Sequence, residues 1–420
     1  MNLLNFCKDL YEIPRSLTGK GVVKTLGYIQ NIIPIEIKKV KSGTKVFDWT
    51  VPPEWNINDG YVVELSTGKK VIDFKSHNLH VVGYSEPIDD EMSFEELEKN
   101  LHFLRDQPDA IPYITSYYSK RWGFCLSFNE FQKLDRDSRY KVFIDSEFKE
   151  NGDLTYGELI IKGKVKKEIF FSSYVCHPQM VNNELSGPSV LTGIAKYLLK
   201  KDNYYTYRFV LIPETIGSIT YLSKNLDVLK KNVIGGFNIS CVGDERMWGY
   251  LPSRNGNTFT DKLVKFVFKD QGIDYKKFCW YQDRGSDERQ YCMPGIDLPV
   301  VNVTRSKWDE YEEYHTSLDN FDLVTKKGLD ESLDFYLKCV EVLENNRKFK
   351  LKVLGEPQLG KRGLYPTVSD KNTWIKVKNL CNVISMCDGE NDLIDICEFL
   401  NISFKECDEI IDNLKEGGLI

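Results

Sequence analysis

The chain has 420 residues, 41% of them hydrophobic and 28% charged, and its 62 acidic and 56 basic side chains leave a formal charge of −6. This balance is typical of a globular protein and excludes disordered, collagen-like and coiled-coil chains. It also argues against binding nucleic acid through bulk positive charge. At roughly 150 residues per domain, we expect about two or three domains.

The 11 cysteines are scattered and never spaced as Cys-x-x-Cys, which argues against a disulfide framework and against a zinc ribbon or finger. Reduced thiols are typical of the cytosol. Lys8 and Asp9 interrupt the first apolar stretch, and no later stretch is long and uncharged enough to span a bilayer. We therefore expect a cytoplasmic protein without a membrane anchor.

Near the N-terminus, apolar residues at helical spacing on both sides of residues 14–19 predict two helices that dock on a larger core. From about Val46 to Ser85, short β-type runs broken by Pro- and Gly-rich turns predict a small β-rich insert. Residues 94–106 then predict one amphipathic helix, capped by Ser93 with Glu96 as its capping-box partner.

Beyond this helix the pattern becomes α/β. Nearly continuous apolar runs alternate with helical segments, as is typical of strands that are buried on both faces. We expect a mixed, mainly parallel sheet covered by helices. The runs are residues 140–144, 168–175, 208–212, 233–239 and 298–303.

The C-terminal part predicts a separate helical module after a linker at 355–366, which is rich in Gly, Pro, Lys and Arg. Two short helices at 392–400 and 403–414, followed by the start of a strand at 417–420, have the order of a winged helix. Residues 404–416 carry five acidic side chains and two lysines, a net charge of 2 − 5 = −3. Because DNA binding relies on neutralising phosphates, this charge favours dimerisation or protein docking over nucleic-acid binding.

Polar side chains follow four of the predicted strands: His177, Glu214, Asp244 and, after an acidic loop, His315. Ligands of an open α/β sheet bind at the carboxyl ends of its strands. A zinc hydrolase needs imidazole and carboxylate ligands and a carboxylate base that does not bind the metal. Each residue alone could be a structural hydrogen-bonding group or a helix cap, but all four at separate strand ends favour a site.

At these positions the sequence resembles the aminopeptidase-like proteins of bacterial polysaccharide clusters, which are distant relatives of the cocatalytic zinc aminopeptidases. The resemblance covers nearly the whole chain. It rests on these motifs, in this order: RSLTGKG, FDWTVPPEW, HNLHVVGYS, IPYITSYYSKRWGFC, CHPQMVNNELSGPSVL, PETIGS, CVGD, RGSDERQYCMPGIDLP and EYHTSLDN.

The resemblance implies a three-layer, mixed-sheet core of the phosphorylase/hydrolase type. Within the α/β chain, we expect this core to comprise residues 1–40 and 108–354. The β-rich inserted domain would comprise residues 41–107, and the winged-helix-like domain residues 367–420 after the linker.

The resemblance also implies roles for individual residues. His177, Asp244 and His315 would be metal ligands, and Glu214 would be the general base. Asp287 would lie in the wall of the site. Other candidates for the substrate pocket are Tyr314, Tyr118 and Arg254, although the aromatic segment at 113–118 could equally be a packed corner and residues 254–257 only a turn.

Two departures from the family pattern limit the metal chemistry. The zinc aminopeptidases have a metal-bridging aspartate where this chain has Asn183, and an amide oxygen is a weak, neutral ligand. Glu184 is a substitute if the loop shifts by one residue. The relatives also have paired glutamates where this chain has Glu214 and Thr215. We therefore expect one zinc ion at most.

Three functions remain open. The first is a zinc-dependent amide or peptide bond hydrolase of the aminopeptidase type, acting on a peptide or on an amide-bearing glycan intermediate. The second is a pseudoenzyme that binds a ligand or a protein partner. The third is a winged-helix regulator. The C-terminal module is the expected contact for a homo-oligomer or a partner protein.

Overall fold

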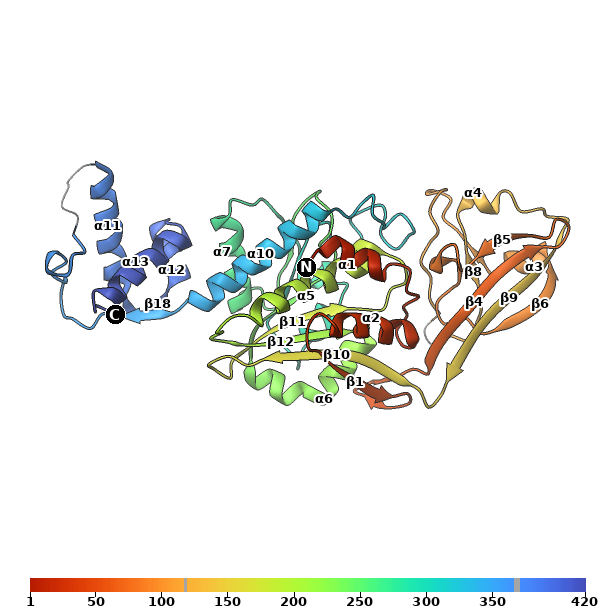
Figure 1. The fold of residues 1–420 in the computed structure, drawn as a ribbon, viewed down its shortest axis with the longest axis horizontal. Helices are drawn as coiled ribbons and strands as arrows, with labels where there is room; N and C mark the ends of the chain where they lie inside the picture. The colour runs from red at the N-terminus through yellow and green to blue at the C-terminus, as the bar shows by residue number, and fades with distance from the viewer. Residues whose placement is uncertain (117–118, 366–370) are drawn as a thin grey trace. The chain divides into compact units, whose positions relative to one another are not determined.

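A computed structural model describes residues 1–116, 119–365 and 371–420. The chain divides into two compact units (Figure 1). The first comprises residues 1–261 and 275–334, and the second comprises residues 262–274 and 335–420. In the described residues, no helix combines the length and the apolar character needed to cross a bilayer.

An eight-stranded mixed sheet forms the centre of the first unit. Its central strands β12, β11, β13 and β16 pair in parallel, whereas β1, β10 and β14 join by antiparallel pairing. Every residue of β11 and β12 is buried, as their continuous apolar sequences predict. In spatial order the strands are β1 (Glu36–Lys41), β10 (Asp153–Ile161), β12 (Thr206–Ile212), β11 (Glu168–Tyr174), β13 (Val233–Asn238), β16 (Val300–Thr304), β14 (Gly249–Leu251) and β15 (Lys276–Lys277).

Helices cover both faces of this sheet, which confirms the predicted α/β architecture. Figure 1 shows α1, α2 and α5 on one side of β10 to β12 and α6 on the other. The two predicted N-terminal helices are α1 and α2, and α1 packs against α5. The helices are α1 (Leu3–Leu10), α2 (Lys20–Gln30), α5 (Ser186–Leu198), α6 (Ile216–Asn232), α8 (Trp280–Asp283) and α9 (Glu288–Tyr291).

A four-stranded antiparallel sheet forms the β-rich insert, in the order β5-β4-β9-β6. The run at 140–144 lies here as part of β9 and not in the main sheet as predicted. Its burial alternates along the strand, because Lys141 and Phe143 face away from the apolar side that holds Tyr140, Val142 and Ile144. The strands are β4 (Glu54–Glu64), β5 (Lys69–Asp73), β6 (Ile88–Ser93) and β9 (Arg139–Lys149), with a small hairpin of β2 (Lys45–Val46) and β3 (Trp49–Thr50) nearby in sequence.

The helix predicted at 94–106 is shorter than expected. The capping box of Ser93 and Glu96 is present, but α3 (Phe94–Glu98) ends after five residues. The chain then forms β7 (Leu101–His102), which pairs in parallel with β8 (Phe124–Cys125). This tertiary pairing overrides the local helical periodicity, and α4 (Phe128–Phe131) follows with a capping box of its own.

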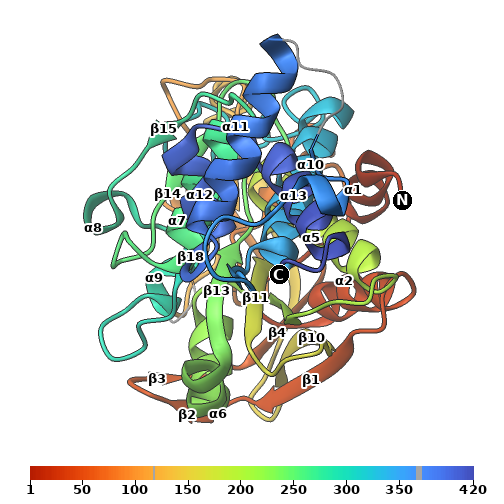
Figure 2. The same ribbon diagram turned by 90° about the vertical axis from the view of Figure 1, so that its left-hand side faces the viewer.

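The second unit contains the predicted C-terminal helices, now bounded as α12 (Leu393–Leu400) and α13 (Phe404–Glu416). Asn401 is in the left-handed conformation and ends α12, and the Ser403 side chain caps α13. Residues 417–420 form no strand; the two-stranded sheet of this unit pairs β17 (Lys348–Lys350) with β18 (Asp388–Asp392). Figure 2 shows α12 and α13 grouped with α11 (Lys371–Met386) beside β18.

The ammonium group of Lys262 joins two distant parts of the second unit. It lies on the segment of α7 (Phe259–Asp270) that belongs to this unit, and it forms ion pairs with Asp392 at 2.9 Å and Asp395 at 2.7 Å. The remaining helix, α10 (Lys326–Asn345), leads into the unit from residue 335.

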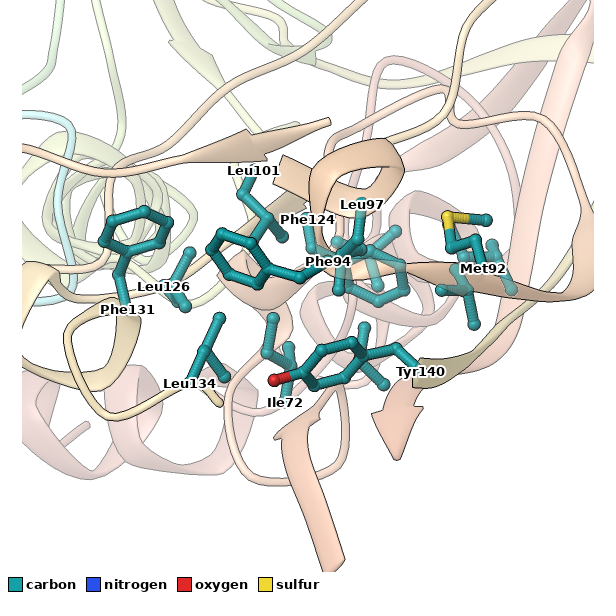
Figure 3. Packing of buried hydrophobic residues seen from close by; sticks show 14 of the residues in the cluster. Ile72, Met92, Phe94, Leu97, Leu101, Phe124, Leu126, Phe131, Leu134 and Tyr140 are labelled. Atoms are coloured by element: carbon teal, nitrogen blue, oxygen red, sulfur yellow. The ribbon is translucent and has the colours of Figure 1, made fainter. Parts of the chain in front are cut away.

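Phe124 provides a test of the packing in the insert. It is 0% exposed in a cluster with Phe94, Leu97 and Tyr140 (Figure 3). Phe124→Ala removes an aromatic ring from this core, so we expect the free energy of unfolding to fall by about 3–5 kcal/mol in urea titrations. Phe47→Ala is the control, because Phe47 is 54% exposed. Equal losses in both variants would contradict the packing described.

Candidate active site at the strand ends

The parallel pairing of β11 and β12 brings two of the predicted site residues together. Tyr174 and Ile212 are paired at the carboxyl ends of β11 and β12. His177 follows three residues after Tyr174, and Glu214 follows two residues after Ile212. The His177 Nε2 atom lies 3.6 Å from Glu214 Oε2. His177 is buried, whereas the Glu214 side chain keeps 19% of its surface exposed. Solvent therefore reaches the carboxylate but hardly the imidazole ring.

The other ring nitrogen of His177 is held by Glu184. The Nδ1 atom lies 3.2 Å from Glu184 Oε2, which also accepts the backbone N–H groups of His177 at 2.9 Å and Cys176 at 3.2 Å. Burial favours the neutral imidazole, but the contacts with Cys176, Glu184 and Glu214 outweigh it and raise the pKa of His177 well above its ordinary value. A carboxylate that orients a histidine in this way leaves the opposite ring nitrogen directed at the site.

Glu184 in turn forms a fully buried ion pair. Its Oε1 atom lies 3.2 Å from Arg15 Nε, and both side chains are 0% exposed. Arg15 also donates to the backbone carbonyls of His177 and Leu10. Glu184 therefore acts as the structural anchor of the loop after β11, with its charge neutralised by a residue from the N-terminal segment.

His315 presents a second imidazole. Its Nε2 atom is buried and has no hydrogen-bond partner among the described residues. The Tyr314 ring stacks on it at 3.9 Å between centroids, and the Tyr113 ring lies edge-on to both His315 at 5.2 Å and His177 at 5.4 Å. Burial and the neighbouring His177 lower the pKa of His315 to about 3, so its ring is neutral at physiological pH.

Asn183 and Asp244, the other predicted ligands, have protein partners in the structure. Asn183 Oδ1 accepts hydrogen bonds from the Tyr174 hydroxyl and, at 3.8 Å, from the Cys241 thiol. Both oxygens of Asp244 accept two hydrogen bonds each, from Asn182, Ser306 and the Arg246 backbone. To bind an ion, Asp244 would have to exchange some of these bonds, so its role as a ligand stays a prediction.

One cluster in the described part of the chain gathers three potential ligand atoms within 4.8 Å, on Cys176, His177 and Glu184. The Glu184 carboxylate is already paired with Arg15. Burial raises the pKa of the Cys176 thiol to about 11, and its Sγ atom accepts the backbone N–H of Glu214 at 3.2 Å. All three groups therefore also belong to a hydrogen-bond network that supports the loop after β11.

The remaining predicted pocket residues lie in different surroundings. Asp287 is fully buried behind Thr215. Arg254 donates to the Cys292 carbonyl and pairs with Asp297, so it holds the turn between them. Tyr118 lies outside the described residues.

Asp319 is a supporting residue that the sequence did not single out. It lies in the motif EYHTSLDN and accepts the backbone N–H groups of Val181, Asn182 and Asn183 and the hydroxyl of Tyr311. Burial raises its pKa to about 6. Arg15 was also missed as a site residue, because nothing in its local sequence indicates that an arginine is buried against Glu184.

The Arg15–Glu184 pair can be tested with a double-mutant cycle. Removing one partner leaves a buried charge uncompensated, so we expect Glu184→Gln and Arg15→Met each to lower the free energy of unfolding by about 3–5 kcal/mol. The double variant should lose less than the sum, because neither charge then remains unpaired. Urea unfolding of the four proteins gives the coupling energy, and additive losses would contradict the ion pair.

Glu288 generates a pH-dependent prediction. It is fully buried beside Asp287, accepts the backbone N–H groups of Gly285 and Ser286, and burial raises its pKa from 4.5 to about 7. The folded state holds this proton more tightly than the unfolded state. Its contribution to stability is therefore complete below about pH 4.5 and is lost as the pH rises through about 7.

The isosteric variant Glu288→Gln should remove this dependence. Between pH 4.5 and 8, we expect wild-type stability to fall by about 3 kcal/mol more than that of the variant, from the shift of the single carboxyl group. Urea unfolding of both proteins across this range is the measurement. Parallel pH profiles would show that Glu288 is ionised in the folded protein.

Comparison with known proteins agrees with the resemblance seen in the motifs. Residues 4–346 match a family described as a domain of unknown function (DUF4910), and residues 347–420 match a winged helix-turn-helix family. The chain is 45% identical to a Clostridium acetobutylicum protein named as a polysaccharide biosynthesis protein with an aminopeptidase-like domain, over 100% of this chain and 95% of that one.

Solved structures extend this comparison. A Clostridium acetobutylicum protein described as a peptidase superimposes with a TM-score of 0.93 at 44% identity, over 100% of this chain and 96% of that one. A zinc aminopeptidase from Bacillus subtilis matches with a TM-score of 0.58 at 13% identity, over 81% of this chain and 94% of that one, which shows a shared fold. The chain therefore belongs to the DUF4910 family of aminopeptidase-like proteins and carries a C-terminal winged-helix domain.

Proposed function

We propose that the protein is a metal-dependent hydrolase of peptide or amide bonds. The observation that carries this proposal is the pairing of His177 and Glu214 at the strand ends, with His177 Nδ1 fixed by Glu184 and Nε2 directed at the Glu214 carboxylate. An aminopeptidase-like fold supports the same reaction class. The name of the Clostridium relative favours an amide-bearing intermediate of polysaccharide synthesis as the substrate.

The donor set suits one zinc ion. His177 Nε2, once it has lost its proton, and His315 Nε2, which has no hydrogen-bond partner among the described residues, are imidazole nitrogens of the kind that zinc takes in catalytic sites. Asn183 supplies only a neutral amide oxygen, already bonded to Tyr174, where a second ion would need a bridging carboxylate. A bound zinc ion would lower the pKa of a water molecule toward ~7 and polarise the carbonyl of the scissile amide.

Glu214 performs the proton transfers in this proposal. Its partly exposed carboxylate accepts a proton from the attacking water and returns it to the nitrogen of the leaving amine. His177 stays oriented by Glu184 throughout, and the Tyr113 and Tyr314 rings limit the access of bulk water to the imidazoles. For the C-terminal domain, the acidic α13 supports protein docking rather than DNA binding. Eleven unpaired cysteines support a cytoplasmic location.

Metal content tests the first part of the proposal. Elemental analysis of the full chain, purified without chelator or histidine tag, should give about one zinc ion per chain, and His315→Ala should lose it because one of two imidazole ligands is removed. His102→Ala is the matched control, since His102 lies in β7 of the insert. A chain that stays free of zinc after dialysis against zinc would contradict the metal-dependent mechanism and leave a binding protein on an aminopeptidase scaffold.

Glu214→Gln tests the second part. The amide keeps the shape of the carboxylate but cannot take up a proton, so we expect zinc content to persist while kcat on aminoacyl p-nitroanilides falls by about 10²–10⁴-fold. Asp297→Asn, a carboxylate change at the turn held by Arg254, is the control. If Glu214→Gln retained full activity, Glu214 would not be the base.

A further inference from the structure

The residue that follows Glu214 has a strained backbone. Thr215 has φ 63° and ψ −76°, and the Ile216 N–H donates to the Glu214 carbonyl at 2.8 Å. These values describe a γ-turn with positive φ, a conformation that is rare and strained for a β-branched residue. The turn connects the end of β12 directly to α6, and it therefore determines the direction in which the Glu214 side chain leaves the backbone.

Two side chains from the start of α9 hold this turn. Asp287 Oδ1 accepts the Thr215 N–H at 2.7 Å and the Ser218 hydroxyl at 2.7 Å. Arg289 Nη2 donates to the Thr215 hydroxyl. Asp287 is 0% exposed, and its second oxygen has no hydrogen-bond partner in the described part of the chain.

Strained conformations persist where surrounding interactions over-determine them, and they cluster at functional sites. Here the bonds to Thr215 come from an element distant in sequence, which is itself held by Glu288 through the Gly285 and Ser286 N–H groups. Without Asp287, the partly buried Thr215 N–H would lose its acceptor, and the turn would relax toward negative φ. Such a relaxation would rotate Glu214 away from His177.

We propose that Asp287, assisted by Arg289, is a positioning residue that holds the strained turn at Thr215 and so keeps the Glu214 carboxylate facing His177. Its effect on catalysis rests on the proposed function, whereas its effect on the turn does not. Asp287 itself does not contact substrate, because it is buried behind Thr215.

Glycine substitution at Thr215 gives a specific test. Glycine adopts positive φ without a steric penalty, so it should make the turn independent of Asp287. Crystal structures of Asp287→Ala should show Thr215 outside the positive-φ region and a longer distance between His177 Nε2 and Glu214 Oε2. The double variant Asp287→Ala/Thr215→Gly should restore both. Asp287→Ala/Thr215→Ala is the matched control, because alanine also lacks the hydroxyl but keeps the Cβ atom that causes the strain.

The kcat values of the variants should change in parallel with the position of the Glu214 carboxylate. We expect Asp287→Ala to lower kcat on aminoacyl p-nitroanilides by about 100-fold with little change in KM, since small displacements of a catalytic group cost about this much. Asp287→Asn should retain most activity, because its amide oxygen still accepts both bonds. The glycine double variant should recover at least about tenfold, and the alanine double variant should not.

Three results would overturn the proposal. They are an unchanged turn in Asp287→Ala, equal losses in Asp287→Asn and Asp287→Ala, and no recovery in the glycine double variant. If the wild-type protein hydrolyses none of the substrates, the proposed function fails, but the structures still decide whether Asp287 holds the turn. Should Asp287→Ala not fold, Arg289→Ala carries the same structural comparison, with a smaller displacement expected.

Discussion

The guanidinium of Arg15 lies without solvent contact against the equally buried carboxylate of Glu184, and the geometry of the site depends on this pair. Two opposite charges in a low-dielectric interior stabilise each other only when their geometry is good and their remaining hydrogen bonds are made. Arg15 meets the second condition in part, with the carbonyls of His177 and Leu10, and Glu184 Oε2 accepts the backbone N–H groups of Cys176 and His177. Arg15 Nη2 and, outside the ion pair, Glu184 Oε1 have no hydrogen-bond partner among the described residues. The pair thereby joins the N-terminal segment, the end of β11 and the start of α5.

The two groups at the centre of the site are oriented by different physical means. His177 is held by a charged hydrogen bond to a buried carboxylate. Glu214 is directed by the backbone, through a turn whose unfavourable dihedral angles are stabilised by hydrogen bonds from α9. Both arrangements reduce the motion of the reacting groups before a substrate arrives, which is the condition for efficient proton transfer over short distances.

The side chains at the expected metal-ligand positions Asn183 and Asp244 form hydrogen bonds within this chain. The Asn183 amide bonds to the Tyr174 hydroxyl, where an aspartate would bring a negative charge into the interior. The Asp244 carboxylate accepts hydrogen bonds from Ser306 and the Arg246 backbone N–H. His315 Nε2 has no hydrogen-bond partner among the described residues, and its ring lies 5.5 Å from that of the oriented His177, between centroids.

The periodicity of the apolar residues predicted most of the architecture. The buried strands β11 and β12 follow from continuous apolar runs. The N-terminal helices and the last two helices follow from helical spacing of apolar residues and, for the last two, from capping residues next to them in sequence. Local patterns overestimated the length of the helix predicted at 94–106, and they identified the strand at 140–144 but not the sheet to which it belongs. There, pairing with strands distant in sequence decided the structure.

For the site, the sequence alone determined which polar residues end the strands and that a bridging aspartate is absent. Only the tertiary structure decided that Glu184 pairs with Arg15, that Asp319 caps the loop before α5, and that Asp287 supports the turn at Thr215. These roles depend on contacts between residues separated by more than 70 positions in the chain. Hydrogen bonds and ion pairs of this kind arise from the packing of whole elements, and no local pattern of residues encodes them.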